Sequence, residues 1–231
     1  MNIIRNEKTI KRNAQIGKIT SIVSLAVLGG GMYITFKQPD KVSLALTALL
    51  VGFLLSQVGI YFTNRWGRSP RPDEQVDTAL KGFNKQYSLY HYITPASHVL
   101  VGPAGVWVII TKSISGTITY DSEKGRWKKK GGGLLSIYLK IFAQESIGRP
   151  DLEISSETEA LQRYLVKQLP DREIPIRATL VFTHPDVDVQ VADAPNPTLH
   201  AKKLKDYLRK AAKGNPISSN DVEAVQEVLE K

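Results

Sequence analysis

The chain has 231 residues, which is enough for one ordinary domain and something smaller. It has no cysteine, which excludes disulfides and thiolate metal sites. The formal net charge of +9 suggests a nucleic-acid partner, but residues 72–231 hold 21 basic and 20 acidic side chains, and the excess lies before them. The positive net charge of the whole chain therefore gives no independent support for nucleic-acid binding by residues 72–231.

Two stretches near the N-terminus, residues 19–36 and 42–63, contain no charged side chain. Each approaches the roughly 20 apolar residues that cross a bilayer core of about 30 Å. Residues 37–41 join them, so we expect a transmembrane helical hairpin over residues 19–63. A cleaved signal peptide is the competing interpretation of the first stretch; the long basic lead and the immediate second stretch disfavour it.

Small residues in the second stretch indicate how these helices pack. Ala48, Gly52 and Ser56 recur at four-residue spacing, a pattern that lets helices approach closely. We expect them to face Ala26 and Gly30 of the first helix, although a second copy of the chain would serve as well.

The flanking charges predict the orientation of the hairpin. Residues 1–18 are basic, and Arg65, Arg68 and Arg71 follow the second stretch in a proline-containing linker, residues 64–72. By the positive-inside rule, we expect a multi-pass cell-membrane protein whose N-terminus (1–18) and C-terminal domain (73–231) are both cytoplasmic. The lipid bilayer is then its first partner.

The C-terminal domain begins with a helix at Asp73 and Glu74, where acids suit the helix dipole. Apolar runs at residues 99–101 and 106–111 are joined by Gly-Pro-Ala-Gly, which predicts two strands and a tight turn, with Lys112 ending the second strand. Residues 87–92 and 116–120 also read as extended, so we expect an antiparallel meander over residues 88–121.

This meander resembles the core of the nuclease-related domain (NERD) family, whose fold is similar to that of restriction endonucleases. In that family an Asp precedes the turn and the second strand carries Glu-x-Lys. The corresponding positions here are Ser97, Ile110 and Lys112, and Glu74 matches an acid at the start of the preceding helix. The resemblance implies an α/β domain with a mixed sheet, in which the lysine remains and both metal-binding acids are lost.

The loss of both acids affects whether the domain can bind a metal and cleave a phosphodiester. A nuclease of this type holds a hard cation such as Mg²⁺ through carboxylates, for which serine is a poor substitute and isoleucine none. We therefore expect no cofactor, no metal and a non-catalytic binding or scaffold module, in which Lys112 contacts a phosphate or only solvent. The alternative is a metal-dependent nuclease with a migrated carboxylate from Glu153 or Glu157, assisted by Glu74. A third hypothesis is a structural membrane protein whose hairpin is the working part.

One basic cluster lies in the C-terminal domain, at Trp127, Lys128, Lys129 and Lys130. It is a candidate binding surface for nucleic acid or for anionic lipid headgroups, or it is a solvated hairpin tip. The apolar residues 134–142 that follow predict either an interfacial helix or an element packed on the core.

Downstream, the pattern predicts a helix over residues 153–169, a buried strand over 174–183 and an exposed edge strand over 187–191. Two more helices are expected over residues 199–212 and 218–229. The four histidines lie far apart in the sequence and show no metal-ligand spacing.

Overall fold

The computed structural model describes residues 1–131 and 147–230. They form two units, which we describe separately: a helical unit of residues 7–71, and an α/β unit of residues 1–6, 72–131 and 147–230. The apolar segment 134–142, expected to lie in an interface or in the core, falls outside the described residues.

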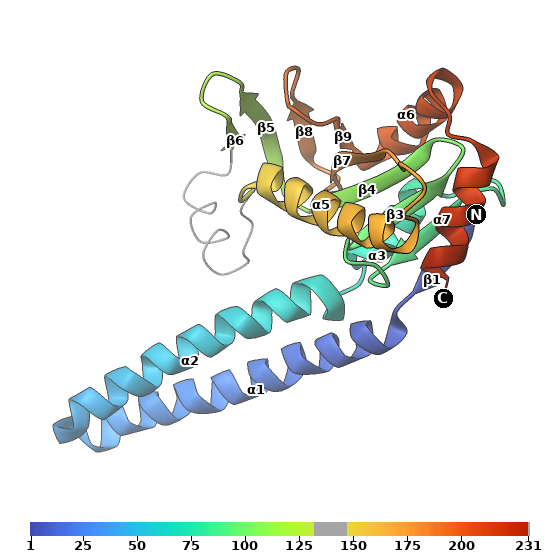
Figure 1. Cartoon of the computed structure of the whole chain (residues 1–231). Helices are drawn as coiled ribbons and strands as arrows, with labels where there is room; N and C mark the ends of the chain where they lie inside the picture. The colour runs from blue at the N-terminus through green and yellow to red at the C-terminus, as the bar shows by residue number, and fades with distance from the viewer. Residues whose placement is uncertain (132–146, 231) are drawn as a thin grey trace. The chain divides into compact units, whose positions relative to one another are not determined.

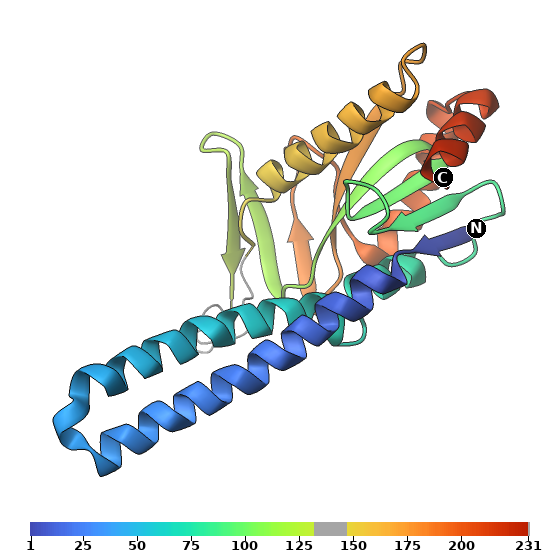
Figure 2. The same cartoon turned by 60° about the horizontal axis from the view of Figure 1, so that its bottom comes forward.

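The helical unit is a hairpin of α1 (Glu7–Lys37) and α2 (Val42–Phe62), joined by the short 3₁₀ turn η1 (Pro39–Lys41). The two helices lie side by side along their lengths (Figures 1 and 2). Both are long and apolar enough to cross a membrane. α2 runs into a π-helical turn, η2 (Thr63–Gly67), where Tyr61, Phe62 and Trp66 cluster.

The contact between α1 and α2 repeats every seven residues. Its buried small residues are Gly17, Ser24 and Gly31 on α1, and Ala45, Gly52 and Gly59 on α2. A Cβ added at Gly52 would come within 2.7 Å of Leu28 Cγ, and one at Gly59 within 2.6 Å of Ser21 Oγ. Glycine is therefore required where the backbones approach most closely.

This repeat corrects the packing expected from the sequence. Gly52 does lie in the contact, and so does Ala48, whose Cβ would lie 3.1 Å from a Cβ at Gly31. Ala26, however, is exposed, and a Cβ at Gly30 would meet nothing within 4 Å. The physical reason is that two helices packed nearly along each other keep the same face in contact at a mean spacing of 3.5 residues, so the pattern repeats after seven residues rather than four.

The α/β unit is built on a mixed six-stranded sheet, as expected. Its order is β1 (Asn2–Arg5), β2 (Ser88–His91), β3 (His98–Gly102), β4 (Gly105–Lys112), β7 (Ile176–Phe182) and β9 (Thr198–His200). β2, β3 and β4 are antiparallel neighbours, whereas β1, β7 and β9 each pair in parallel. Gly105 has a φ of +108°, which explains the glycine that closes the β3–β4 turn.

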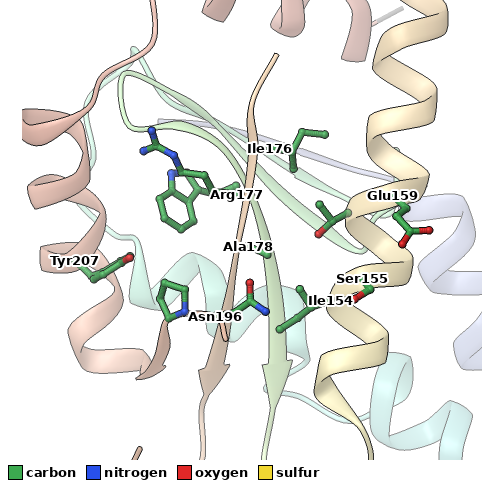
Figure 3. A pocket seen from close by; sticks show the side chains of 11 residues that line it. Ile154, Ser155, Glu159, Ile176, Arg177, Ala178, Asn196 and Tyr207 are labelled. Carbon is green, nitrogen blue, oxygen red and sulfur yellow. The ribbon is translucent and has the colours of Figure 1, made fainter. Parts of the chain in front are cut away.

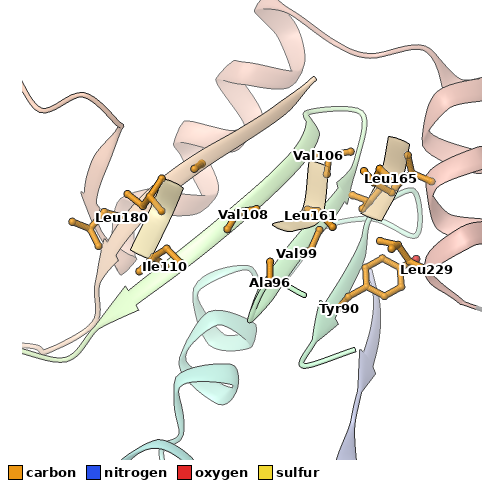
Figure 4. Close-up of a cluster of buried hydrophobic side chains, with 14 of the residues drawn as sticks. Tyr90, Ala96, Val99, Val106, Val108, Ile110, Leu161, Leu165, Leu180 and Leu229 are labelled. Atoms are coloured by element: carbon orange, nitrogen blue, oxygen red, sulfur yellow. The ribbon is translucent and has the colours of Figure 1, made fainter. Parts of the chain in front are cut away.

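Helices cover both faces of this sheet (Figures 1 and 2). α5 (Pro150–Gln168) and α7 (Ser219–Leu229) share one buried cluster with Val99, Val108 and Ile110 (Figure 4). α3 (Pro72–Ala79) and α6 (Ala201–Gly214) share the other cluster with Leu100, Trp107 and Ile109. Side chains alternate between the faces of a strand, so β3 and β4 supply both clusters and are buried throughout most of their lengths.

β1 is a strand that the sequence did not reveal. Residues 1–18 were expected to be a basic N-terminal segment, but Asn2–Arg5 pairs in parallel with β2. The Met1 amino group donates to the Phe83 carbonyl at 3.1 Å, and the Asn6 amide donates to the His91 carbonyl at 3.0 Å. The chain therefore enters the domain's sheet before it enters the hairpin.

A second, three-stranded sheet corrects the expected meander. Its order is β6 (Arg126–Lys130), β5 (Gly116–Asp121) and β8 (Val187–Gln190), so β5 leaves the sheet of β2–β4. Gly116, with a φ of +91°, donates its amide to the Asp186 carbonyl and redirects the chain after β4. β8 is an edge strand, as expected, and pairs in parallel with β5.

Candidate functional site

Ser97 and Glu157 meet at the first position of the degenerate motif. Ser97 immediately precedes β3, and its backbone amide donates to Glu157 Oε2 at 2.8 Å. Its hydroxyl donates to Glu157 Oε1 at 2.7 Å. Both oxygens of a carboxylate on α5 thus accept hydrogen bonds from Ser97, the position that the resemblance assigns to an Asp, and these bonds tie α5 to the start of β3.

Lys112, the third residue that the resemblance identifies, pairs with Glu153 on α5. Lys112 is the last residue of β4, and its Nζ donates to Glu153 Oε1 at 2.6 Å. The lysine side chain is 17% exposed and the glutamate side chain 46%. Glu153 and Glu157 lie four residues apart and share one side of α5, so the helix faces this edge of the sheet with both acids.

Ile110, at the second position, has a different environment. It is 4% exposed and belongs to the apolar cluster beneath α5 (Figure 4). β3 and β4 pair with Val99 opposite Val108, and continuing that register by two residues sets Ser97 opposite Ile110. Of the two positions that the resemblance assigns to metal-binding acids, Ile110 therefore contributes to the core.

These positions do not fit the divalent cation that an intact motif would hold. Ile110 offers no oxygen, and both oxygens of Glu157 already accept from Ser97. Glu74 belongs to α3, which packs on the opposite face of the sheet from α5. Within residues 1–131 and 147–230, no group of three or more histidine, cysteine or acidic side chains could hold a metal ion.

The family model of the nuclease-related domain matches residues 72–183. The chain carries a NERD domain. The matched residues run from the start of α3 to just past β7, and so contain the whole degenerate motif and α5. No curated protein and no solved structure matches the chain.

The α/β unit also contains a buried polar network on the α3 side of the sheet. His91 and His98 are 0% and 2% exposed, and their Nδ1 atoms lie 2.8 Å apart. His91 Nε2 lies 3.0 Å from Asp77 Oδ1, and Asp77 also accepts from Arg5 Nη2. Arg5 Nε lies 3.5 Å from Asp73 Oδ2, so strand β1 is connected to α3 and to both histidines.

The hydrogen-bond roles in this network follow from the acceptor at its centre. An ionised Asp77 can only accept, so His91 carries its proton on Nε2. If His91 is neutral, its Nδ1 accepts and the proton between the two rings belongs to His98 Nδ1. Sequence reasoning missed this network because its members stand in four separate elements, β1, α3, β2 and β3. A local signal is the one-turn spacing of Asp73 and Asp77.

The basic cluster of the NERD domain lies on strand β6, directly after the turn of the β5–β6 hairpin. Lys128 pairs with Asp121 at 2.6 Å, and hydrogen bonds from its side chain and from the Lys124 amide hold the pKa of the Asp121 carboxyl below its usual value. Trp127 is half-buried, packs against the apolar cluster and lies 4.9 Å from the Tyr120 ring. Lys128 and Lys130 are exposed, whereas Lys129 is partly buried.

Proposed function

We propose that this chain is a membrane-anchored NERD-domain protein that does not cleave phosphodiesters and acts as a binding or scaffold module at the cytoplasmic membrane face. One observation carries the proposal: the motif's second acid position, Ile110, is part of the apolar core. A metal-dependent nuclease needs oxygen ligands at that point. The two remaining contacts, Ser97 with Glu157 and Lys112 with Glu153, fix α5 on the sheet.

Membrane anchoring is supported by the surface of the hairpin. Large apolar side chains are exposed on both helices, among them Leu25, Met32, Phe36, Leu46 and Leu50. A core helix of a soluble protein would bury such residues, whereas a lipid bilayer solvates them. Tyr61 and Trp66 lie at the end of α2 next to Arg65, a combination typical of the membrane interface.

The orientation is supported by strand β1. Because Asn2–Arg5 pairs with β2, the residues before α1 and the residues after α2 belong to the same domain. An anchor of two spans returns the chain to its starting side, as this pairing requires. The positive flanks, residues 1–18 and Arg65, Arg68 and Arg71, favour the cytoplasm for that side.

A cleavage assay tests the proposal. Full-length protein in lipid nanodiscs is incubated with single- and double-stranded DNA and RNA and with Mg²⁺ or Mn²⁺, beside an active nuclease as positive control. We expect no cleavage above the protein-free background. Metal-dependent cleavage that copurifies with the protein through two columns and is lost in Lys112→Met would refute the non-catalytic assignment.

A second candidate function is a nuclease that uses migrated carboxylates. The observation that favours it is the hydrogen bond between Lys112 and Glu153, with Glu157 one helical turn further along. On this hypothesis Glu153→Gln and Glu157→Gln would each abolish cleavage, whereas Glu159→Gln, on the same helix, would not. If the wild-type protein shows no cleavage, this candidate is eliminated as well.

The remaining hypothesis is a structural membrane protein in which the helical hairpin, and not the NERD domain, carries the function. A deletion of residues 1–63 would be ambiguous, because it also removes β1 from the sheet. Replacing residues 7–63 by an unrelated two-helix anchor keeps β1 and the domain. If the cellular role survives that replacement, the hairpin serves only as an anchor; if it is lost, the binding-module proposal is wrong.

A further inference from the structure

Strand β7 has an edge that is open along half its length. On one side β7 pairs with β4 from Ile176 to Phe182, whereas on the other side β9 begins only at Leu180. The Leu180 amide donates to the Pro197 carbonyl at 2.9 Å. Among the described residues, no strand continues this pairing along residues 176–179.

The backbone at this edge is ready to accept another strand. Backbone groups of alternate residues point to the same side of a strand. Because the Leu180 amide faces β9, the amide and carbonyl of Ala178 face the same way, beyond the end of β9. Unpaired strand edges of this kind are templates for pairing with a further segment.

A cavity of about 490 Å³ lies along the open edge (Figure 3). One wall comes from α5, with Ile154, Ser155 and Thr158, and the other from Trp107 and Tyr207. Figure 3 shows Ile154 and Ser155 on one side of β7 and Tyr207 on the other. The lining therefore includes both faces of the strand, which suits an extended chain whose side chains alternate between faces better than a compact ligand that occupies one.

The side chains around the edge specify the chemistry of its occupant. Thr158 Oγ1 is buried and has no hydrogen-bond partner among the described residues. Glu159 lines the α5 wall and lies 3.7 Å from Arg163 Nη1 on the same helix. Arg177 lies on the other side, 5.7 Å from the Trp107 ring centre, and donates to the Ala104 and Asn215 carbonyls. An extended segment would match this groove with a basic side chain towards Glu159 and an acidic side chain, next in sequence, towards Arg177.

We propose that the open edge of β7 binds an extended polypeptide segment of a partner protein as an additional strand, continuing the line of β9. The segment carries alternating basic and acidic side chains, directed to the two walls. This inference rests on the proposed binding-module function and names its partner class. A failure of this inference can be told from a failure of the non-catalytic proposal, because peptide binding and phosphodiester cleavage are measured in different assays.

A display selection tests the inference. Full-length protein in nanodiscs is used to select from a random octapeptide library, and enriched peptides are synthesised and measured by fluorescence anisotropy. The decisive variant is Ala178→Pro, which removes the outward amide; proline is tolerated at strand edges where that amide has no partner. Ala178→Ser retains the amide and is the matched control.

We expect enriched peptides with basic and acidic residues at adjacent positions, and binding at least tenfold weaker to Ala178→Pro than to wild type or Ala178→Ser. N-methylation of the peptide, one residue at a time, should abolish binding at alternate positions only, a readout independent of whether the variant folds. No enrichment, equal binding to Ala178→Pro, sensitivity to N-methylation without a two-residue period, or concentration-dependent self-association through this edge would each overturn the proposal.

Discussion

The two faces of the sheet hold polar groups of very different burial around β3 and β4. On the α5 side, Lys112 and Glu153 are 17% and 46% exposed, and Ser97 with Glu157 is partly buried. On the α3 side, His91 and His98 are almost completely buried and lead through Asp77 to Arg5. The most deeply buried polar network around β3 and β4 thus lies on the face opposite Ser97, Ile110 and Lys112.

Substitutions on the two faces should therefore differ in their cost to stability. A buried polar group that loses its partner carries the full cost of desolvation, whereas an exposed ion pair contributes little. If the α5-side contacts only hold a helix in place, their removal should have modest effects on stability and none on chemistry.

Ile110→Glu should be the most destructive change. It restores an acid at a lost motif position but buries a carboxyl among apolar side chains, so the free energy of unfolding should fall by roughly 3 kcal/mol or more. The urea midpoint, followed by tryptophan fluorescence, measures this loss. Ile110→Val is the control, at about 1 kcal/mol. A stable Ile110→Glu protein that gains Mg²⁺-dependent cleavage would show that the site is still organised for a metal.

Asp77→Ala should be next. It leaves Arg5 and the buried His91 without their shared acceptor, and we expect a loss of about 2–3 kcal/mol in the same unfolding measurement. The exposed Asp193 offers a matched control, since Asp193→Ala should change stability by less than about 0.5 kcal/mol. If the two substitutions lowered the free energy of unfolding equally, the buried network on the α3 side would not be the more sensitive site that we expect.

Glu157→Ala should cost about 1–2 kcal/mol, because the Ser97 amide and hydroxyl lose acceptors that are only partly shielded from water. Hydrogen exchange should show increased opening at the start of β3 and in the middle of α5. Glu159→Ala, on the same helix and largely exposed, is the control. If Glu157→Ala lowered the free energy of unfolding more than Asp77→Ala does, the α5 side would be the more sensitive face, contrary to our expectation.

Glu153→Gln should have the smallest effect, below about 1 kcal/mol, because the Glu153 side chain is 46% exposed and a glutamine oxygen can still accept the Lys112 hydrogen bond. The difference from wild type should shrink further at high salt, where exposed charges are screened. The measurement is the urea midpoint at low and at high ionic strength. A difference that stays large in high salt would assign Glu153 a buried role that its exposure does not suggest.

Local patterns predicted much of this structure from the sequence. The turn of Gly102 and Gly105 with its flanking β-branched runs indicated β3 and β4, and the charge-free stretches indicated the hairpin. These features depend on residues close together in the chain. The positions corresponding to the lost acids, Ser97 and Ile110, also follow from local sequence, because both are counted from the same turn.

What the sequence did not predict depends on long-range pairing. β1 is four residues long and stands beside a helix, so no periodicity marks it. The departure of β5 to a second sheet is determined by the backbone at Gly116 and by β8, far along the chain. The acceptors for Ser97 and Lys112 lie 60 and 41 residues away on α5, and only packing of that helix identifies them.

If Ser97, Lys112, Glu153 and Glu157 hold a helix rather than a metal, the protein should not bind Mn²⁺ at this site. Binding is measured by electron paramagnetic resonance of the full-length protein in nanodiscs, beside the Glu153→Gln/Glu157→Gln double variant. We expect the two proteins to give the same spectrum as free Mn²⁺ at equal concentration. One equivalent of bound Mn²⁺ in wild type that disappears in the double variant would contradict the claim.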